Sequence, residues 1–279
     1  MPPAIVRRAA ELRKALGSAR VALTPTMGAL HEGHLSLARI ARRLGEASVV
    51  SIYVNPAQFS AGEDYESYPR DLAEDCKKLD GLADFIFAPD DLYPAPQQVK
   101  ISLPPLAGEL CGAFRPGFFE GVALAVCKLF NCVRPHAAVF GRKDLQQLHI
   151  VRLLAAQLCF PVEIADGAVV READGLAMSS RNAYLSAAER KRAAFLPQTL
   201  RAAAAEIESG EKPEAAAKRA AAALAAKGFG VQYAEARDAA TLGAPGGGKI
   251  ALLAAAVLGK TRLIDNIECA PPKGGEQRT

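Results

Sequence analysis

Short apolar runs alternate with helical patterns over residues 1–170. A continuous apolar run predicts a buried strand, and apolar residues recurring every three or four positions predict a helix. Predicted strands cover residues 21–24, 48–54, 83–87 and 137–140, and predicted helices cover residues 35–44, 72–79, 121–132 and 145–158. This alternation is typical of βαβ units, so we expect an α/β fold with a doubly wound parallel sheet. Charges interrupt the apolar residues at 1–16, which we interpret as the first helix.

The pattern changes in the last third of the chain. Residues 187–227 are rich in Ala and charged residues and are divided by a turn sequence at 209–213, which predicts two surface helices. Three apolar runs follow, at 231–236, 249–258 and 261–268, and are expected to form a small antiparallel sheet. We therefore predict a Rossmann-like domain over residues 1–175 and a smaller α+β lid domain over residues 176–279.

The amino-acid composition excludes several classes of protein. Half of the 279 residues are hydrophobic and 23% are charged, which excludes global disorder. The 34 Lys and Arg residues nearly balance the 30 Asp and Glu residues, so no nucleic-acid partner is expected. The six cysteines form no C-x-x-C pair that would suggest zinc or redox chemistry. No apolar run approaches the ~20 residues of a membrane span, and we expect a cytoplasmic protein without a membrane partner.

The most informative segment is Thr24–His34, between a predicted strand and a predicted helix. It carries His31 and His34, three residues apart, with Gly33 between them. Free N–H groups and the helix dipole favour anions at a helix N-terminus, and imidazoles there can donate to phosphate oxygens. The spacing does not fit a zinc protease, which needs histidines four apart within a helix. The alternative is that both histidines merely cap the helix.

Two further segments are less specific candidates for phosphate binding, and the first of them repeats this strand-to-helix geometry. Gly141–Asp144 follows a predicted strand and opens a helix, where Lys143 would be a mobile cation for phosphate. An ordinary helix cap with a solvated lysine is the alternative. Residues 171–182 carry Ser179, Ser180 and Arg181, which could close over a triphosphate. A plain linker is the alternative for that segment.

Other polar residues are further candidates for ligand or metal binding. Asn55 and Gln58 follow the second predicted strand, so they face the same edge of the sheet as the histidines. Asp75 lies in an acidic stretch and is a candidate magnesium ligand, direct or through water. Residues 243–249 match the start of a phosphate-binding P-loop, but the required Ser or Thr is replaced by Ile250, so we interpret them as a hairpin turn.

Six motifs occur in order over most of the chain: PTMGALHEGH, VNPAQF, YPR, RPG, FGRKDLQQL and MSSRN. Together they resemble the pantothenate synthetase family of the HxGH nucleotidyltransferase superfamily, whose members join pantoate to β-alanine with ATP. The resemblance implies an AMP-forming ligase that works through a pantoyl adenylate. It also implies Mg²⁺ as a cofactor and a homodimer as the assembly.

The resemblance also implies roles for residues at matching positions. His34 would be the catalytic proton donor and His31 would assist at the phosphates, while Lys143 and Arg181 would neutralise charge. Gln58 and Gln147 would bind pantoate, with Asn55 beside them and Gln58 also near β-alanine. The implied ATP-binding residues are Met27, Gly28, Ala29, Leu30, His31, Glu32, Gly33, His34, Gly141, Arg142, Lys143, Asp144, Val170, Met178, Ser179, Ser180 and Arg181.

The chain departs from the family pattern at two positions. Phe118 stands where the pattern has His, and Leu124 stands where it has Thr. We expect altered kinetics or packing rather than lost activity. Two other functions stay open: nucleotidyl transfer to a phosphorylated acceptor, and a non-catalytic nucleotide- or RNA-binding module. Gln58 and Gln147 disfavour the first, because a phosphate acceptor calls for Arg or Lys, and the balanced charge disfavours RNA.

Overall fold

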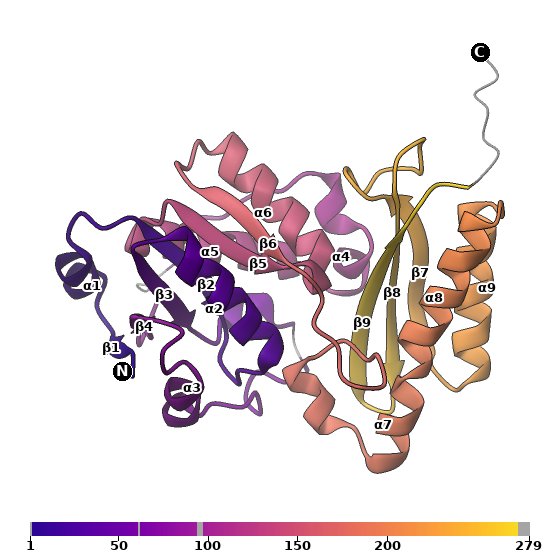
Figure 1. The fold of residues 1–279 in the computed structure, drawn as a ribbon, viewed down its shortest axis with the longest axis horizontal. Helices are drawn as coiled ribbons and strands as arrows, with labels where there is room; N and C mark the ends of the chain where they lie inside the picture. The colour runs from indigo at the N-terminus through magenta and orange to yellow at the C-terminus, as the bar shows by residue number, and fades with distance from the viewer. Residues whose placement is uncertain (1, 61, 94–96, 273–279) are drawn as a thin grey trace. The chain divides into compact units, whose positions relative to one another are not determined.

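A computed structural model describes residues 2–60, 62–93 and 97–272. The chain divides into two compact units (Figure 1). The first unit comprises Met1–Arg142 with Gln146–Val169, and the second comprises Lys143–Leu145 with Val170–Thr279. Within the described ranges, no helix combines the length and the apolar character needed to cross a membrane.

The first unit is built on a six-stranded parallel sheet. Its order is β1-β4-β3-β2-β5-β6, which confirms the predicted doubly wound arrangement. The strands are β1 (Ala4–Val6), β2 (Val21–Thr26), β3 (Ala47–Ile52), β4 (Phe85–Phe87), β5 (Ala137–Gly141) and β6 (Glu163–Gly167). Because β2, β3 and β5 lie inside the sheet, their residues are buried on both faces, which explains their continuous apolar runs.

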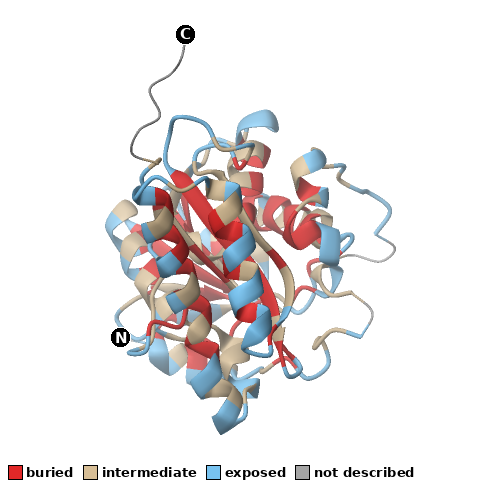
Figure 2. Ribbon diagram, turned by 90° about the vertical axis from the view of Figure 1, so that its right-hand side faces the viewer, coloured by how far each residue is buried: buried red, intermediate tan, exposed pale blue. Residues whose placement is uncertain are grey.

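Helices cover the sheet of the first unit. On one face, Leu37 and Ala41 of α2 pack against Ala22 of β2 and against Ala137 and Val139 of β5. Figure 2 shows buried residues along the strands and on the inward sides of the helices. The helical segments are α1 (Ala9–Leu16), α2 (Glu32–Leu44), η1 (Pro56–Gln58), α3 (Leu72–Lys78), η2 (Pro105–Gly108), α4 (Cys111–Phe114), α5 (Phe118–Val133), η3 (Arg142–Asp144) and α6 (Leu145–Gln157).

Two segments of the first unit differ from the sequence prediction. Residues 1–16 do not form one helix, because Ala4–Val6 pairs with β4, and α1 begins only at Ala9. Pro3 disfavours the helical conformation of the residue before it, which favours the extended start. The strand β6 was not predicted, since its sequence EIADG has two acidic residues and pairs only at the sheet edge with β5.

The second unit is a three-stranded antiparallel sheet with helices against one face. Leu196, Leu200 and Ile207 of α8 share a core with Leu252 and Ala254 of β8. Figure 1 shows α8 and α9 beside the sheet of this unit. The elements are η4 (Ser180–Tyr184), α7 (Ala187–Ala193), α8 (Phe195–Glu208), α9 (Pro213–Ala226), β7 (Gly230–Asp238), β8 (Ile250–Leu258) and β9 (Thr261–Cys269). The sequence predicted two helices over residues 187–227, but the structure has three there, because α7 and α8 are separate helices. The glycine-rich segment joins two antiparallel strands, which confirms the hairpin turn.

Candidate active site

The order in which successive strands join the first unit's sheet reverses at its centre. β2 and β5 are neighbours, and the chain continues from β2 to β3 on one side and from β5 to β6 on the other. In open α/β sheets, ligands bind at the carboxyl ends of strands where the order switches in this way. β2 ends at Thr26, directly before residues 27–34, and β5 ends at Gly141, directly before Arg142. The topology therefore brings two of the predicted phosphate-binding segments to one point of the sheet edge.

Both histidines of the first segment cap α2. Nδ1 of His31 accepts the N–H of Gly33 at 3.2 Å, and Nδ1 of His34 accepts the N–H of His31 at 3.4 Å. The ring centroids are 4.1 Å apart. A ring nitrogen that accepts a hydrogen bond carries no hydrogen, so each neutral ring carries its proton on Nε2. Capping and donation to an anion therefore use different atoms of the same rings, and the two interpretations of the motif are compatible.

The helix α3 holds the loop that precedes these histidines. Oδ1 of Asp75 accepts the N–H of Leu30 at 2.8 Å, and Oδ2 accepts the N–H of Ala29 at 3.0 Å. Lys78, one turn further along α3, donates to the carbonyl of Leu30 at 3.0 Å. Gly28 has a φ of +83°, and a Cβ there would lie 2.9 Å from Oδ2 of Asp75. The backbone of the loop is thus fitted closely around one carboxylate.

Both carboxylate oxygens of Asp75 are used in hydrogen bonds within the protein. The residue is 2% exposed, and both carboxylate oxygens already accept backbone N–H groups. Burial raises the pKa of Asp75, and the two N–H groups oppose that rise. Within residues 2–60, 62–93 and 97–272, no three His, Cys, Asp or Glu side chains group in a way that could hold a metal ion. The geometry assigns Asp75 to the support of the loop, and it gives no support to the predicted metal site.

A network of side-chain amides follows β3. Asn55 is the N-cap of η1, and its Oδ1 accepts the N–H of Ala57 at 3.2 Å. Its Nδ2 donates to Oε1 of Gln58 at 3.0 Å and to the carbonyl of Gly121 at 3.1 Å. Nε2 of Gln58 lies 2.8 Å from Sδ of Met27. Two predicted substrate residues therefore lie in contact with each other and with the ATP segment.

Arg115 supports the main chain of this network. Its guanidinium donates to both carboxylate oxygens of Glu63, at 2.7 and 2.6 Å, and to the carbonyl of Gln58 at 3.1 Å. The same guanidinium lies 3.7 Å from the ring centroid of Phe118. A cation is attracted to the face of an aromatic ring, so Phe118 has a packing role at the position that departs from the family pattern.

Some of the residues after β5 have structural contacts, and others are candidates for substrate binding. Arg142 donates to Asp166 at 3.1 Å, which holds its guanidinium beside β6. Gln146 is buried and donates to the carbonyls of Leu106 and Glu109, both at 2.8 Å, so it is structural. Its neighbour Gln147 is half-buried on α6. Gln147 as a pantoate ligand stays a prediction.

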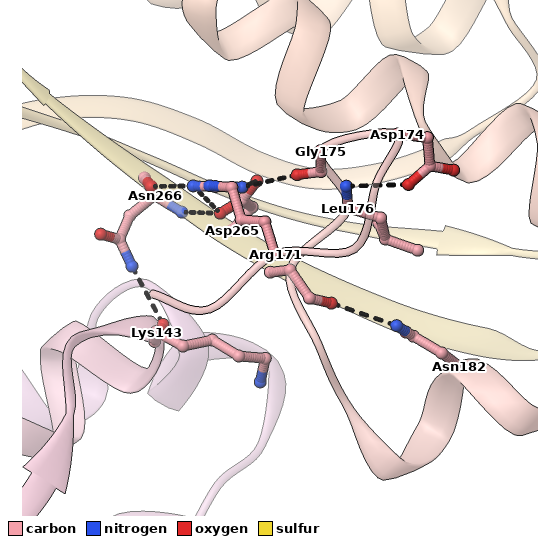
Figure 3. A network of polar contacts seen from close by, with 9 residues as sticks. Lys143, Arg171, Asp174, Gly175, Leu176, Asn182, Asp265 and Asn266 are labelled. Atoms are coloured by element: carbon pink, nitrogen blue, oxygen red, sulfur yellow. Dashed lines mark hydrogen bonds and ion pairs between the residues drawn. The ribbon is translucent and has the colours of Figure 1, made fainter. Parts of the chain in front are cut away.

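A buried ion pair organises the second unit (Figure 3). Arg171 donates to both oxygens of Asp265, at 2.7 and 3.0 Å, and to the carbonyls of Gly175 and Asn266. The Asp265 side chain is fully buried, and burial raises its pKa while Arg171 opposes the rise. Nδ2 of Asn266 donates to the carbonyl of Lys143 at 3.0 Å. Strand β9 thus holds the main chain of a predicted catalytic cation.

The other predicted ATP residues of the second unit form an ordered loop. The N–H of Met178 donates to the carbonyl of Val170 at 3.0 Å. Oγ of Ser179 accepts the N–H of Arg181 at 3.3 Å and caps η4. These bonds give the segment a defined conformation, and its contact with ATP stays a prediction.

The predicted residues therefore fall into two groups. The first unit carries residues 27–34, Asn55, Gln58, Asp75, Gly141, Arg142 and Gln147, and the second carries Lys143, Asp144, Val170 and residues 178–181. Supporting residues that were not predicted as part of the site include Glu63, Lys78, Asp265 and Asn266. No local signal marks them, because each acts on a segment remote in sequence.

Comparison with known proteins gives a consistent result. The family model described as pantoate-beta-alanine ligase matches residues 4–268. The chain is 52% identical over 278 residues to a pantothenate synthetase of Thiobacillus denitrificans, covering 97% of this chain and 98% of the relative. It is 48% identical over 264 residues to a pantothenate synthetase of Nitrosospira multiformis, covering 92% and 95% of the two chains.

Solved structures agree with the sequence comparisons. The fold is similar to that of pantothenate synthetase from Thermus thermophilus, with a TM-score of 0.91, 41% identity and coverage of 96% of this chain and 100% of that chain. It is also similar to a pantoate-beta-alanine ligase from Francisella tularensis complexed with β,γ ATP and β-alanine, with a TM-score of 0.81, 29% identity and coverage of 95% and 97%.

Proposed function

The chain belongs to the pantoate-β-alanine ligase family, and from this premise we propose that it condenses pantoate with β-alanine using ATP, giving pantothenate, AMP and diphosphate. The observation that best supports this proposal is the pair of histidines that cap α2 at the switch point of the sheet. The Nε2 atoms of these histidines hold the protons. Such donors suit a reaction in which negative charge increases on phosphate oxygens.

In the first step, a pantoate carboxylate oxygen attacks the α-phosphorus of ATP. The bond from that phosphorus to the β-phosphate oxygen breaks, and diphosphate leaves with its electron pair. His34 donates a hydrogen bond to the departing phosphates, and His31 assists. Lys143 and Arg181 neutralise the remaining charge. Positioning a weak carboxylate nucleophile against a polyanion is the main requirement of this step.

Pantoate is held by amide side chains. Its hydroxyl groups both donate and accept hydrogen bonds, and an amide offers both functions. Gln58 and Gln147 contact pantoate in this proposal, and Gln58 also lies near β-alanine. Asn55 acts through Gln58, because its four hydrogen-bonding positions are occupied within the protein. A phosphorylated acceptor would call for Arg or Lys here, so transfer to such an acceptor is disfavoured.

In the second step, the amine of β-alanine attacks the carbonyl carbon of the pantoyl adenylate. The C–O bond to AMP breaks, an amide forms, and the amine loses a proton. Water would hydrolyse the mixed anhydride, so the proposal includes closure of the second unit over the site. Val170 and residues 178–181 would then contact ATP together with residues 27–34 and 141–144.

Three further properties belong to the proposal. Magnesium would accompany ATP, with no step assigned to it, because the described residues offer no ligand cluster for it. The active protein would be a homodimer, which light scattering coupled to gel filtration tests. A cytoplasmic location would supply its ATP.

The decisive experiment is pantoate-dependent exchange of labelled diphosphate into ATP without β-alanine. The two-step scheme predicts exchange that requires pantoate and gives pantothenate and AMP once β-alanine is added. AMP formed only when both substrates are present, with no exchange, would contradict the adenylate intermediate. A dinucleotide product with a phosphorylated acceptor would replace the proposed activity altogether.

A further inference from the structure

Tyr93 is a half-buried residue whose hydroxyl the proposed reaction does not use. Its Oη donates to Oδ1 of Asn55 at 2.6 Å, across 38 positions of sequence. The Tyr93 ring lies beside the ring of Tyr53, with centroids 6.2 Å apart, and the ammonium of Lys128 lies 4.9 Å from its centroid. Burial raises the pKa of Tyr93, so the hydroxyl stays protonated and can donate.

The hydrogen-bonding capacity of Asn55 is fully used. Its Oδ1 accepts from Tyr93 and from the N–H of Ala57, and its Nδ2 donates to Gln58 and to the carbonyl of Gly121. A side-chain amide has two acceptor positions and two donors, so none is left for a ligand. Asn55 is 2% exposed, as expected for a residue that acts within the protein.

Backbone groups fix the direction of the hydrogen bonds that link Tyr93, Asn55 and Gln58. The N–H of Ala57 can only donate, so the Asn55 atom that faces it is oxygen and Tyr93 must donate to that oxygen. The carbonyl of Gly121 can only accept, so the other Asn55 atom is nitrogen and the facing atom of Gln58 is oxygen. Gln58 must therefore present its Nε2 group, which lies against Met27. A Cβ on Gly121 would lie 1.9 Å from the carbonyl oxygen of Ala57, so this packing requires glycine.

We propose that Tyr93 is a positioning residue for the hydroxy acid: through Asn55 it holds the amide of Gln58 with its N–H group directed at pantoate oxygens. The inference rests on the proposed function for the identity of the substrate. The backbone sets the polarity of the amides, and the Tyr93 hydroxyl restrains the plane of the Asn55 amide. Loss of the hydroxyl should weaken pantoate binding without changing the groups that contact ATP.

The test compares Tyr93→Phe with Tyr53→Phe, which removes the hydroxyl of the neighbouring ring. In pantoate-dependent exchange, Tyr93→Phe should raise the KM for pantoate about tenfold, as expected for one lost hydrogen bond, with kcat and the KM for ATP within about twofold. Tyr53→Phe should change the KM for pantoate less than about twofold. In a Gln58→Ala background, Tyr93→Phe should add less than about twofold to kcat/KM. An equal effect in both backgrounds, or an equal rise in Tyr53→Phe, would overturn the proposal.

A second measurement does not depend on activity. Side-chain amide signals of Asn55 and Gln58 in the ¹⁵N NMR spectrum, assigned with Gln58→Ala and Asn55→Ala, should both shift in ligand-free Tyr93→Phe. An unchanged Gln58 signal would overturn the chain of contacts. If the wild type showed no pantoate-dependent exchange while both signals shifted, the proposed function would fail and the contact chain would stand.

Discussion

In the proposed function, each of the two histidines at the start of α2 caps the helix with one ring nitrogen and donates to phosphate with the other. The backbone N–H groups of Gly33 and His31 occupy the Nδ1 atoms, which leaves the proton on Nε2. Donors that are oriented before substrate arrives need no rearrangement during the reaction. A helix cap therefore sets the tautomer that the proposed phosphate binding requires.

Two substitutions at His34 separate these tasks. His34→Asn keeps an acceptor near the Nδ1 position and loses the distal N–H, while His34→Gln keeps a distal N–H and loses the acceptor. We expect kcat to fall on the order of 10²-fold in His34→Asn with little change in Tm, because a transition-state donor is lost. His34→Gln should retain more turnover and have the lower Tm. Exchange kinetics and thermal unfolding measure both, and identical turnover in the two variants would contradict the division.

Asp75 offers a second test at the scale of one residue. Asp75→Asn keeps the shape but turns an N–H group toward Ala29 or Leu30, both of which donate. We expect the KM for ATP to rise about tenfold through a misplaced loop, with the Mg²⁺ concentration for half-maximal rate unchanged. Asp71→Asn, which alters the cap of the same helix, is the matched control. A large rise in the Mg²⁺ requirement confined to Asp75→Asn would restore the metal-ligand role.

At the scale of elements, one carboxylate of β6 joins the end of β5 to α6. Asp166 accepts from Arg142, which directly follows β5, and from Arg152 of α6. Burial opposes ionisation, but the two guanidinium groups hold the pKa of Asp166 below its usual range. The native state keeps this carboxylate ionised at a lower pH than the unfolded chain does. Its contribution to stability is therefore complete above about pH 4 and is lost as the pH falls through the lower native pKa.

Asp166→Asn should reduce the free energy of unfolding by about 1 kcal/mol at pH 7, since the ion pair is partly exposed. The difference from the wild type should shrink below about pH 4. Urea unfolding at pH 7, 5 and 3.5 measures it. Asp90→Asn, at an exposed ion pair with Arg7, is the control and should change stability little at any pH. A difference for Asp166→Asn that is independent of pH would contradict the assignment.

Strands that are buried on both faces are easier to predict from the sequence than strands at the edge of the sheet. β2, β3 and β5 are buried on both faces, so the sequence shows them as continuous apolar runs. β1 and β6 lie at the sheet edges and depend on pairing with remote strands. β1 has only three residues and β6 carries two acidic residues, so neither gives a comparable signal. The boundary between α7 and α8 was missed because alanine-rich sequence favours helix throughout.

At the scale of the whole molecule, the sequence predicts the site where contacts are local. Glycine and histidine at a strand-to-helix junction mark residues 27–34 without any knowledge of the fold. The bond between Arg171 and Asp265 spans 94 positions, and the one between Tyr93 and Asn55 spans 38. Such pairs form only when the fold brings remote segments together, so the supporting residues emerge from the structure alone.

The proposed closure of the second unit over ATP makes a prediction for the whole chain. Because the mixed anhydride must be shielded from water, residues 27–34 of the first unit and residues 178–181 of the second should both become protected when ATP and pantoate bind. Hydrogen–deuterium exchange should slow about tenfold or more in both segments. The outer strand β7 serves as the internal control and should not change. Protection confined to residues 27–34 would mean that the second unit does not close on the nucleotide.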